Sequence, residues 1–376
     1  MKRGGPAIPA IAAGLAVVAS LLVCTVAAGA PADWSAGAAT VQVWTDNVFG
    51  TEPSPGDGIT DGRGWLAWRP ASALRLAANG RLLRFRDNPD LDHGYVTVMA
   101  EALPSARDAQ TRWQAGVAQA WRLNGDLYEP FDYRDTNAYA SARHYLAAGF
   151  SAQLRADAAW RRYPEQPVED ARRAWLSLRL QRSLPTRTSL TLSLRQGWKA
   201  YRDDAQAPAA ARELGLQAAQ SLSSRMALRA WGSLSDLYEH GDSAAQLAAF
   251  DNPLLDEFSS DGGRVGAALK VITPWNVTAE LSGERARLTY PGRPPTVYDA
   301  TSNLFVLEGE SLALADGERR DIVTRARLAV ERPGVRLGRG TQLDLTAAVE
   351  WNDAESNDLY WQWSGWSVQA GASITF

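Results

Sequence analysis

The C-terminal stretch from Trp366 to Phe376 alternates strictly between apolar and polar positions. The apolar positions are Trp366, Val368, Ala370, Ala372, Ile374 and Phe376. A period of two is typical of a β-strand that has one apolar and one polar face. At about 3.3 Å per residue and with the usual tilt, such a strand spans roughly 25 Å, which is about the height of a bilayer's hydrocarbon band. The stretch therefore predicts a strand that crosses a membrane.

The same alternation recurs upstream and predicts an all-β chain. The clearest example is the pair of segments 176–180 and 190–194, in which every second residue is leucine. A helical period is the alternative for windows rich in alanine and arginine, such as 152–160, but a period of two fits most windows better. The predicted strands cover residues 39–49, 62–69, 73–86, 94–102, 111–123, 137–150, 153–163, 171–183, 188–202, 212–222, 225–238, 263–272, 277–290, 321–332, 341–352 and 359–376.

These sixteen segments predict a closed antiparallel transmembrane β-barrel. An even number of strands is required for closure when both termini lie in the periplasm. The second and fourth segments alternate less regularly, so fourteen strands is the alternative. Short connections fall at 70–72, 103–110, 151–152, 184–187, 223–224, 273–276 and 333–340, and longer ones at 50–61, 87–93, 124–136, 164–170, 203–211, 239–262, 291–320 and 353–358. This asymmetry predicts short periplasmic turns and long extracellular loops.

The N-terminus has the layout of a secretory signal peptide. Lys2 and Arg3 precede an apolar run over 10–26, and small residues follow over 28–32. We therefore expect a signal peptide over 1–32 and a single barrel domain over 33–376, with an N-terminal anchor helix as the alternative. Removal of this segment also removes Cys24, so the mature chain has no disulfide, and a closed barrel is one fold that needs none.

The charge balance gives no argument for a nucleic-acid partner. Without Lys2 and Arg3 the chain carries 37 basic residues against 42 acidic ones, a net charge of −5. The mean hydropathy is −0.27, yet the chain contains 15 Trp. This combination fits a barrel in which lipid-facing and lumen-facing residues alternate.

Charged residues fall on the polar faces of the predicted strands. An arginine that faces lipid at mid-bilayer costs about 2–4 kcal/mol, so the alternation assigns these side chains to the lumen. The predicted lumen-lining residues are Arg155, Asp157, Arg161, Arg179, Arg195, Arg229, Lys270, Glu280, Glu284, Arg325, Arg327, Asp344 and Glu350. About sixteen strands leave an aqueous channel, which favours a pore, whereas an ion-paired network that fills a narrow barrel is the alternative. The predicted membrane-interface aromatics are Trp113, Trp121, Trp160, Trp366 and Phe376.

The loops give two further expectations. Segments 239–262 and 291–320 carry many apolar residues for solvated loops, so at least one is expected to fold into the mouth or lumen, with packing on the rim as the alternative. The acidic residues Asp57, Asp61, Asp87, Asp90, Asp92, Asp353, Glu355 and Asp358 are expected to be solvated loop charges. Bridging of lipopolysaccharide through divalent cations is the alternative, although the spacing matches no defined calcium loop.

The chain shows no catalytic or metal-binding motif. It has three histidines, no Gly-x-Ser-x-Gly, no His-Glu-x-x-His, no cysteine pair and no phosphate loop. We therefore expect no catalytic site, no metal and no cofactor. A lipid-modifying enzyme that uses His144 or His240 is the alternative. The register directs His144 toward lipid, which indicates a bulge or a strand end.

The predicted signal peptide, the alternation, the loop asymmetry and the terminal Phe376 together resemble the features of Gram-negative outer-membrane β-barrel proteins of the porin-like class. The resemblance covers essentially the whole mature chain. It rests on features that the whole class shares and not on a motif of one family. It implies passive diffusion of small hydrophilic solutes, including anionic ones, across the cell outer membrane. It also implies contacts with outer-membrane lipid and lipopolysaccharide, recognition of the C-terminal strand by the barrel assembly machinery, and a homo-oligomer such as a trimer. A closed structural or adhesive barrel that acts through its outer loops is the alternative.

Overall fold

The computed structural model describes residues 34–48, 56–104, 110–147, 149–202, 208–239, 258, 260–298, 305–307, 310–338 and 340–376. The predicted signal peptide over 1–32, including Cys24, lies outside these residues, and so does His240.

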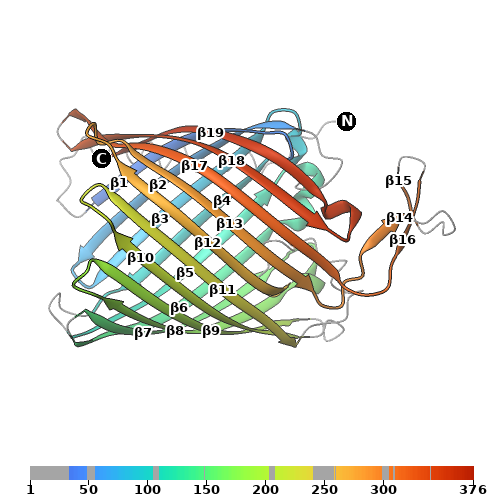
Figure 1. The fold of residues 1–376 in the computed structure, drawn as a ribbon, viewed down its shortest axis with the longest axis horizontal. Helices are drawn as coiled ribbons and strands as arrows, with labels where there is room; N and C mark the ends of the chain where they lie inside the picture. The colour runs from blue at the N-terminus through green and yellow to red at the C-terminus, as the bar shows by residue number, and fades with distance from the viewer. Residues whose placement is uncertain are drawn as a thin grey trace.

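Sixteen strands of the described chain form one closed antiparallel barrel (Figure 1). The strands are β1 (Trp34–Thr45), β2 (Asp57–Ala71), β3 (Leu74–Phe85), β4 (His93–Ala102), β5 (Thr111–Asn124), β6 (Tyr133–Ala147), β7 (Phe150–Arg162), β8 (Ala171–Ser183), β9 (Thr188–Tyr201), β10 (Ala209–Ser221), β11 (Met226–Glu239), β12 (Asp261–Ile272), β13 (Thr278–Tyr290), β17 (Arg319–Gly338), β18 (Thr341–Ser356) and β19 (Trp363–Thr375). Each pairs with its neighbours along the chain, and β13 pairs with β17. The first and last strands close the barrel in the register Gly37↔Thr375 to Thr45↔Ser367.

Apolar side chains cover the outside of the barrel. Leu216, Leu234 and Val265 are 60%, 62% and 64% exposed, and they share their face with the other exposed leucines and valines of their strands. Such a surface is stable only when lipid covers it, because apolar area in water is unfavourable. The prediction of a transmembrane barrel with sixteen strands is therefore confirmed, and the alternative of fourteen strands is wrong.

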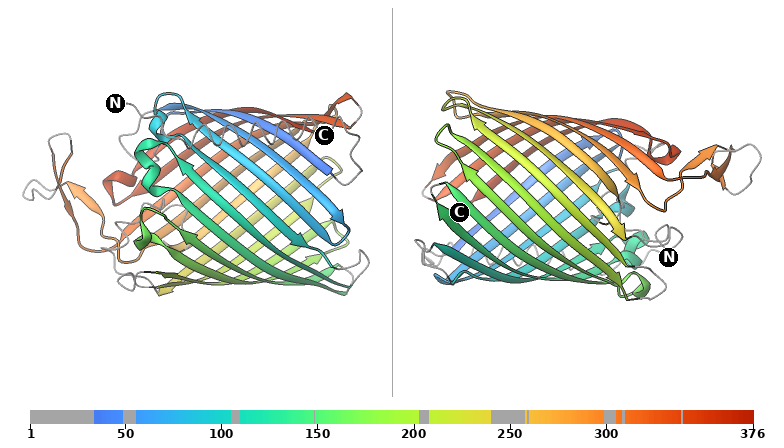
Figure 2. Two further views of the ribbon diagram at one scale, coloured as in Figure 1. Left: turned by 180° about the vertical axis from the view of Figure 1, so that it is seen from behind. Right: turned by 60° about the horizontal axis from the view of Figure 1, so that its bottom comes forward.

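The two ends of the barrel differ as predicted. Short turns and the C-terminus lie at one end, and the longer connections lie at the other (Figures 1 and 2). The longer connections include the 3-10 helices η1 (Pro89–Leu91), η2 (Asp126–Phe131), η3 (Pro167–Glu169) and η4 (Leu359–Trp361). Within the described ranges, no helix is both long and apolar enough to cross a membrane. We refer to the short-turn end as periplasmic and to the opposite end as extracellular.

The two long loops behave differently. In the loop after β13, β14 (Thr296–Tyr298), β15 (Phe305–Leu307) and β16 (Glu310–Leu314) form a small separate sheet. This sheet projects beyond the extracellular end of the barrel in Figure 2. In the loop after β11, Phe258 is 3% exposed and packs against Trp175 on the inner wall, with ring centroids 4.9 Å apart. Phe258 therefore lies against the inner wall, as expected for one of the two loops; the other apolar residues of segment 239–262, from Leu247 to Leu255, lie outside the described residues.

Several strand limits differ from the prediction. The second strand begins at Asp57, so Asp57 and Asp61 belong to β2 and not to a loop. Glycines at 58, 62 and 64 leave few side chains to show the alternation there. Asp353 and Glu355 likewise belong to β18. β17 continues to Gly338 because a bulge between Arg332 and Val335 accommodates Pro333, which cannot donate a ladder hydrogen bond.

The most deeply buried side chains lie near the extracellular end. Tyr290 and Asp321 are 0% and 1% exposed. The guanidinium of Arg319 lies 4.1 Å from the centre of the Tyr290 ring and 3.9 Å from that of Trp361, and it pairs with Asp321. This cluster ties β13, β17 and η4 together at the mouth.

Candidate functional site

The predicted lumen residues all lie on the inner faces of their strands. Arg155 and Asp157, for example, alternate with Leu154, which is 52% exposed on the outer face. The ion pairs that involve them are Arg155–Asp157 at 2.6 Å, Arg161–Asp135 at 3.2 Å, Arg195–Glu213 at 2.9 Å, Arg229–Glu280 at 3.4 Å, Arg325–Glu350 at 3.3 Å and Arg327–Glu350 at 3.7 Å. The interior is therefore lined with charge, much of it paired across strands.

The remaining predicted residues have other surroundings. Glu284 accepts a hydrogen bond from Nε1 of Trp231 at 3.0 Å. Asp344 accepts one from the backbone N–H of Gly334 at 2.7 Å and one from the Ser373 hydroxyl at 3.4 Å. Lys270 lies opposite Glu280 in the β12–β13 register without a short ion pair. Arg179 forms no ion pair with any described carboxylate.

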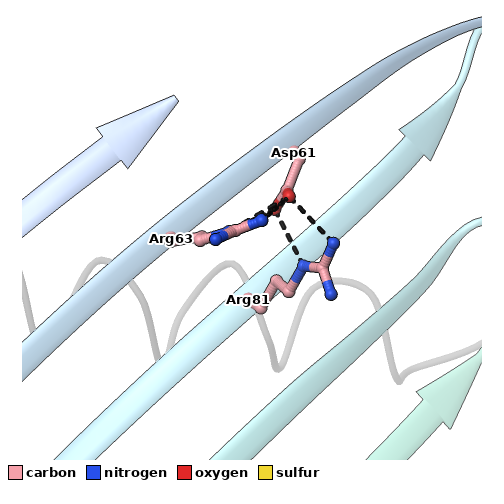
Figure 3. A network of polar contacts seen from close by, with 3 residues as sticks. All are labelled: Asp61, Arg63 and Arg81. Atoms are coloured by element: carbon pink, nitrogen blue, oxygen red, sulfur yellow. Dashed lines mark hydrogen bonds and ion pairs between the residues drawn. The ribbon is translucent and has the colours of Figure 1, made fainter. Parts of the chain in front are cut away.

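Three carboxylates on the inner wall each hold two arginines. Asp61 pairs with Arg63 at 2.5 Å and with Arg81 at 2.9 Å (Figure 3). Asp135 pairs with Arg161 and, at 3.0 Å, with Arg173. Glu350 makes the same two-to-one arrangement with Arg325 and Arg327. In the Asp61 and Glu350 groups, two arginines therefore share one carboxylate.

A single line of directly opposed residues links much of the inner wall. It runs through Arg75, Glu101, Gly116, Tyr139, Asp157, Trp175, Gly197, Ala211 and Leu237 on β3 to β11. Arg75 is near a periplasmic turn and Leu237 is near the extracellular end. Directly opposed residues therefore lie closer to the extracellular end on each successive strand from β3 to β11. Along this line, Glu101 accepts hydrogen bonds from Arg75 at 2.9 Å and from the Tyr139 hydroxyl at 2.5 Å.

Aromatic rings on the inner wall lie flat against glycines of the next strand. A Cβ atom at Gly116 would lie 2.6 Å from the ring of Tyr139, and one at Gly197 would lie 2.5 Å from the ring of Trp175. The pairs Gly37–Trp65 and Gly266–Trp231 repeat the arrangement, which gives four cases among the described residues. Packing of an aromatic ring over a cross-strand glycine fixes strand register.

Three of these rings also contact an arginine. The guanidinium of Arg155 lies 4.1 Å from the centre of the Tyr139 ring, and that of Arg195 lies 4.2 Å from the centre of the Trp175 ring. Arg229 lies 5.0 Å from the ring of Trp231. These cation–π contacts hold the arginine side chains along the wall.

A cavity of about 800 Å³ opens on the inner wall of β6 to β9. Its lining includes four arginines, Arg155, Arg173, Arg179 and Arg195, and one carboxylate, Asp157. Tyr139 and Trp175 supply its aromatic surface. The cavity can hold a hydrated anionic solute, because guanidinium groups donate hydrogen bonds to carboxylates and phosphates.

Sequence reasoning missed Asp61, Glu101, Asp135, Tyr139 and Arg173. Glu101 lies on the polar face of a predicted strand, so a complete use of the alternation would have found it. The importance of Tyr139 and Arg173 comes from their cross-strand partners, which a single sequence does not specify.

The predicted interface aromatics lie on the outer face. Trp113, Trp160, Trp366 and Phe376 are 59%, 46%, 56% and 43% exposed, and Trp121 is partly exposed. His144 also faces outward, close to the periplasmic end of β6, and its Nδ1 lies 2.7 Å from the Thr111 hydroxyl. Among the described side chains, no group of three or more His, Cys, Asp or Glu could hold a metal ion.

Two carboxyls in the extracellular connections have perturbed acidity. Burial raises the pKa of Asp92, although the N–H of Phe85 donates to it at 2.7 Å. Burial also raises the pKa of Asp132, which accepts hydrogen bonds from the backbone N–H of Asn124 at 2.6 Å and from its amide at 3.0 Å. Each carboxyl follows a 3-10 helix and holds the end of a neighbouring strand.

No protein-family model and no curated protein sequence matches the chain. Among solved structures, CdiB from Acinetobacter baumannii is similar with a TM-score of 0.54 and 8% identity over 92% of this chain and 61% of that one. OprD from Pseudomonas aeruginosa gives 0.48 and 12% over 92% and 95%, and the siderophore receptor PirA from the same organism gives 0.42 and 11% over 92% and 81%. At these identities the likeness shows the fold alone. The chain therefore has the fold of an outer-membrane β-barrel, a closed antiparallel barrel of sixteen strands with an apolar outer surface.

Proposed function

We propose that the protein is a channel for the passive diffusion of small hydrophilic solutes, with a preference for anions. The observation that carries the proposal is the arginine-lined cavity on the inner wall of β6 to β9. A barrel of about sixteen strands is wide enough to keep such a wall hydrated. Rings of basic side chains favour anions in pores because they raise the local anion concentration.

The arginines that outnumber their carboxylate partners on the inner wall support a preference for anions over cations. The Asp61 and Glu350 groups each hold two arginines against one carboxylate. In addition, Arg179, Arg264 and Lys270 face inward without an ion pair to a described carboxylate. In water, one unit charge about 8 Å from a passing ion contributes about 0.5 kcal/mol, which is about a twofold change in local anion concentration. Salt screens this effect beyond about 8–10 Å, so the preference should weaken as ionic strength rises.

The test is the conductance and reversal potential of the refolded protein in planar bilayers under a KCl gradient. We expect a steady conductance with a reversal potential of the sign that indicates chloride preference. Replacement of Arg179 and Arg264 by Glu should shift that potential toward cation preference. Arg182 lies on the outer face of β8 near the periplasmic turn, so Arg182→Glu is the matched control and should change little.

Two results would contradict the proposal. Absence of any ion current from correctly folded protein would favour the closed structural or adhesive barrel. An unchanged reversal potential in the Arg179→Glu, Arg264→Glu variant would show that these charges do not set the selectivity.

The terminal strand supports a proposal about assembly. β19 presents Trp366 and Val368 outward and the chain ends at Phe376, whose backbone N–H donates to the carbonyl of Ala36 at 2.9 Å. We propose that the barrel assembly machinery recognises this strand before it pairs with β1. Deletion of Phe376 should then lower the amount of folded protein in the outer membrane of expressing cells and leave refolding in detergent intact.

A further inference from the structure

Three arginines face outward on the adjacent strands β13 and β17. Arg285 and Arg287 share the outer face of β13 with Leu281, which is 58% exposed, and Arg320 shares the outer face of β17 with Leu328, which is 48% exposed. All three are exposed. Arg287 lies opposite Ile322 on β17, two residues from Arg320, so the three side chains occupy one surface. We call Arg285, Arg287 and Arg320 the outer basic surface.

The outer basic surface lies at the height of the extracellular tryptophans. Arg285 is linked through Thr324 to Asp353, which is one outward position beyond Trp351 on β18. On the other side, Trp198 of β9 lies opposite Ala210 near the extracellular end of β10. Among the described outward side chains of β10 to β13 and β17, none is aromatic. Arginines of β13 and β17 therefore occupy the height at which β1, β5, β7, β9, β18 and β19 place a tryptophan on the outer face.

The three guanidinium groups have no anionic partner among the described residues. None of them forms an ion pair there, and none of their side chains forms a hydrogen bond. Asp353 and Glu355 lie across β17 on β18, where they also form no ion pair with a described arginine. A cation at the edge of the hydrocarbon band is costly unless an anion or water satisfies it.

The anion available at this height is a lipid phosphate. A phosphate oxygen accepts strong, charge-assisted hydrogen bonds from arginine, often two at a time. The exposed Val265, Leu281 and Leu328 lie directly on the periplasmic side of the arginines, where acyl chains attached to that phosphate would extend. The arginines on the extracellular side and the apolar side chains on the periplasmic side match an amphiphile that has a phosphorylated headgroup.

We propose that the outer basic surface binds the phosphorylated headgroup of an outer-leaflet lipid, with its acyl chains along β12, β13 and β17. The site is on the outside of the barrel and does not depend on conduction. It gives the predicted contact with lipopolysaccharide a definite place, on the barrel wall and not on the acidic loops.

The experiment is native mass spectrometry of the detergent-solubilised full barrel after incubation with lipid A that carries both phosphates, with enzymatically dephosphorylated lipid A as the second probe. One arginine near an anionic headgroup contributes about a fivefold change in affinity, so Arg285→Gln, Arg287→Gln, Arg320→Gln should lower retention of the phosphorylated lipid roughly a hundredfold. The matched control is Arg182→Gln, Arg332→Gln, Arg179→Gln. It removes the same charge from the periplasmic end of the outer face and from the interior, and it should retain the lipid.

Each outcome decides the proposal. The proposal is supported if the unchanged protein and the control variant retain phosphorylated lipid A and the Arg285→Gln, Arg287→Gln, Arg320→Gln variant does not. It is overturned if the unchanged protein retains phosphorylated and dephosphorylated lipid A equally. It is also overturned if the control variant loses as much phosphorylated lipid A as the triple variant. Formation of a dimer that the triple variant abolishes would assign the surface to a second copy of the chain and would also overturn it. Heat-modifiable gel mobility, which reports barrel closure, verifies that every variant is folded before binding is compared.

Discussion

The glycine beneath Trp175 allows a sharp test of how the inner wall is packed. An ideal Cβ at Gly197 would lie 2.5–2.6 Å from three carbon atoms of the indole. Carbon atoms attract optimally at about 3.5–4.0 Å, so a methyl group would force the ring back by about 1 Å. The ring cannot easily retreat, because Phe258 packs on it at 4.9 Å and Arg195 at 4.2 Å. Overpacking of this kind costs about 1–3 kcal/mol.

The matched control is Gly283→Ala on the outer face of β13. A Cβ there would have its nearest heavy atom at 3.8 Å, which is ordinary contact, and its φ is not in the left-handed region. Alanine in place of a strand glycine removes flexibility from the unfolded chain and stabilises by about 0.5–1 kcal/mol. Gly197→Ala shares this gain, so the two variants should differ by the overpacking cost, about 1–3 kcal/mol in the free energy of unfolding.

The measurement is equilibrium unfolding in guanidinium chloride, followed by tryptophan fluorescence in the same lipid or detergent. In bilayers, Gly197→Ala should also lower single-channel conductance, because the displaced ring moves toward the lumen, and Gly283→Ala should not. Equal stability of the two variants would refute the argument that the Trp175 ring is held flat against β9. If Gly197→Ala alters the conductance but leaves the free energy of unfolding unchanged, the ring moves as argued and only the expected cost of overpacking is refuted.

Three other changes test separate parts of the structure. Tyr139→Phe removes the hydroxyl that donates to Glu101, so it should destabilise the barrel by about 1–2 kcal/mol in denaturant titrations; an unchanged midpoint would mean that water replaces the bond. Phe258→Ala removes the ring that covers Trp175, so it should raise conductance and, because that ring is buried, lower the free energy of unfolding by about 3–5 kcal/mol. An unaltered current would place Phe258 away from the conducting path. Asp132→Asn tests the raised pKa. A carboxyl with a raised folded-state pKa favours folding only at low pH and loses that contribution as pH rises, so the variant should unfold at a higher temperature than the unchanged protein at about pH 7 and at the same temperature at about pH 3. A lower melting temperature at neutral pH would contradict this assignment.

The sequence alone determined the class of fold. Alternation between oil-facing and water-facing positions is a local property, because successive side chains of a strand point to opposite sides. It therefore assigned Arg155 and Asp157 to the inner face and Leu154 to the outer face without any knowledge of their partners. Loop length is equally local, and it assigned the C-terminus to the short-turn end. The alternation misplaced strand limits by several residues, for example where side chains are missing, as in the glycine-rich start of β2, and where a bulge extends a strand, as at Pro333 in β17.

The tertiary structure decided which charges meet and which remain free. Arg229 and Glu280 are 51 residues apart and meet only because β11, β12 and β13 adopt one register. Likewise, Asp61 proved to be an inner-wall carboxylate shared by two arginines, whereas its sequence context suggested a loop. The three unpaired arginines of the outer basic surface also became visible only after closure. Register and closure arise from pairing between strands that are distant in the chain, so no single stretch of sequence contains that information.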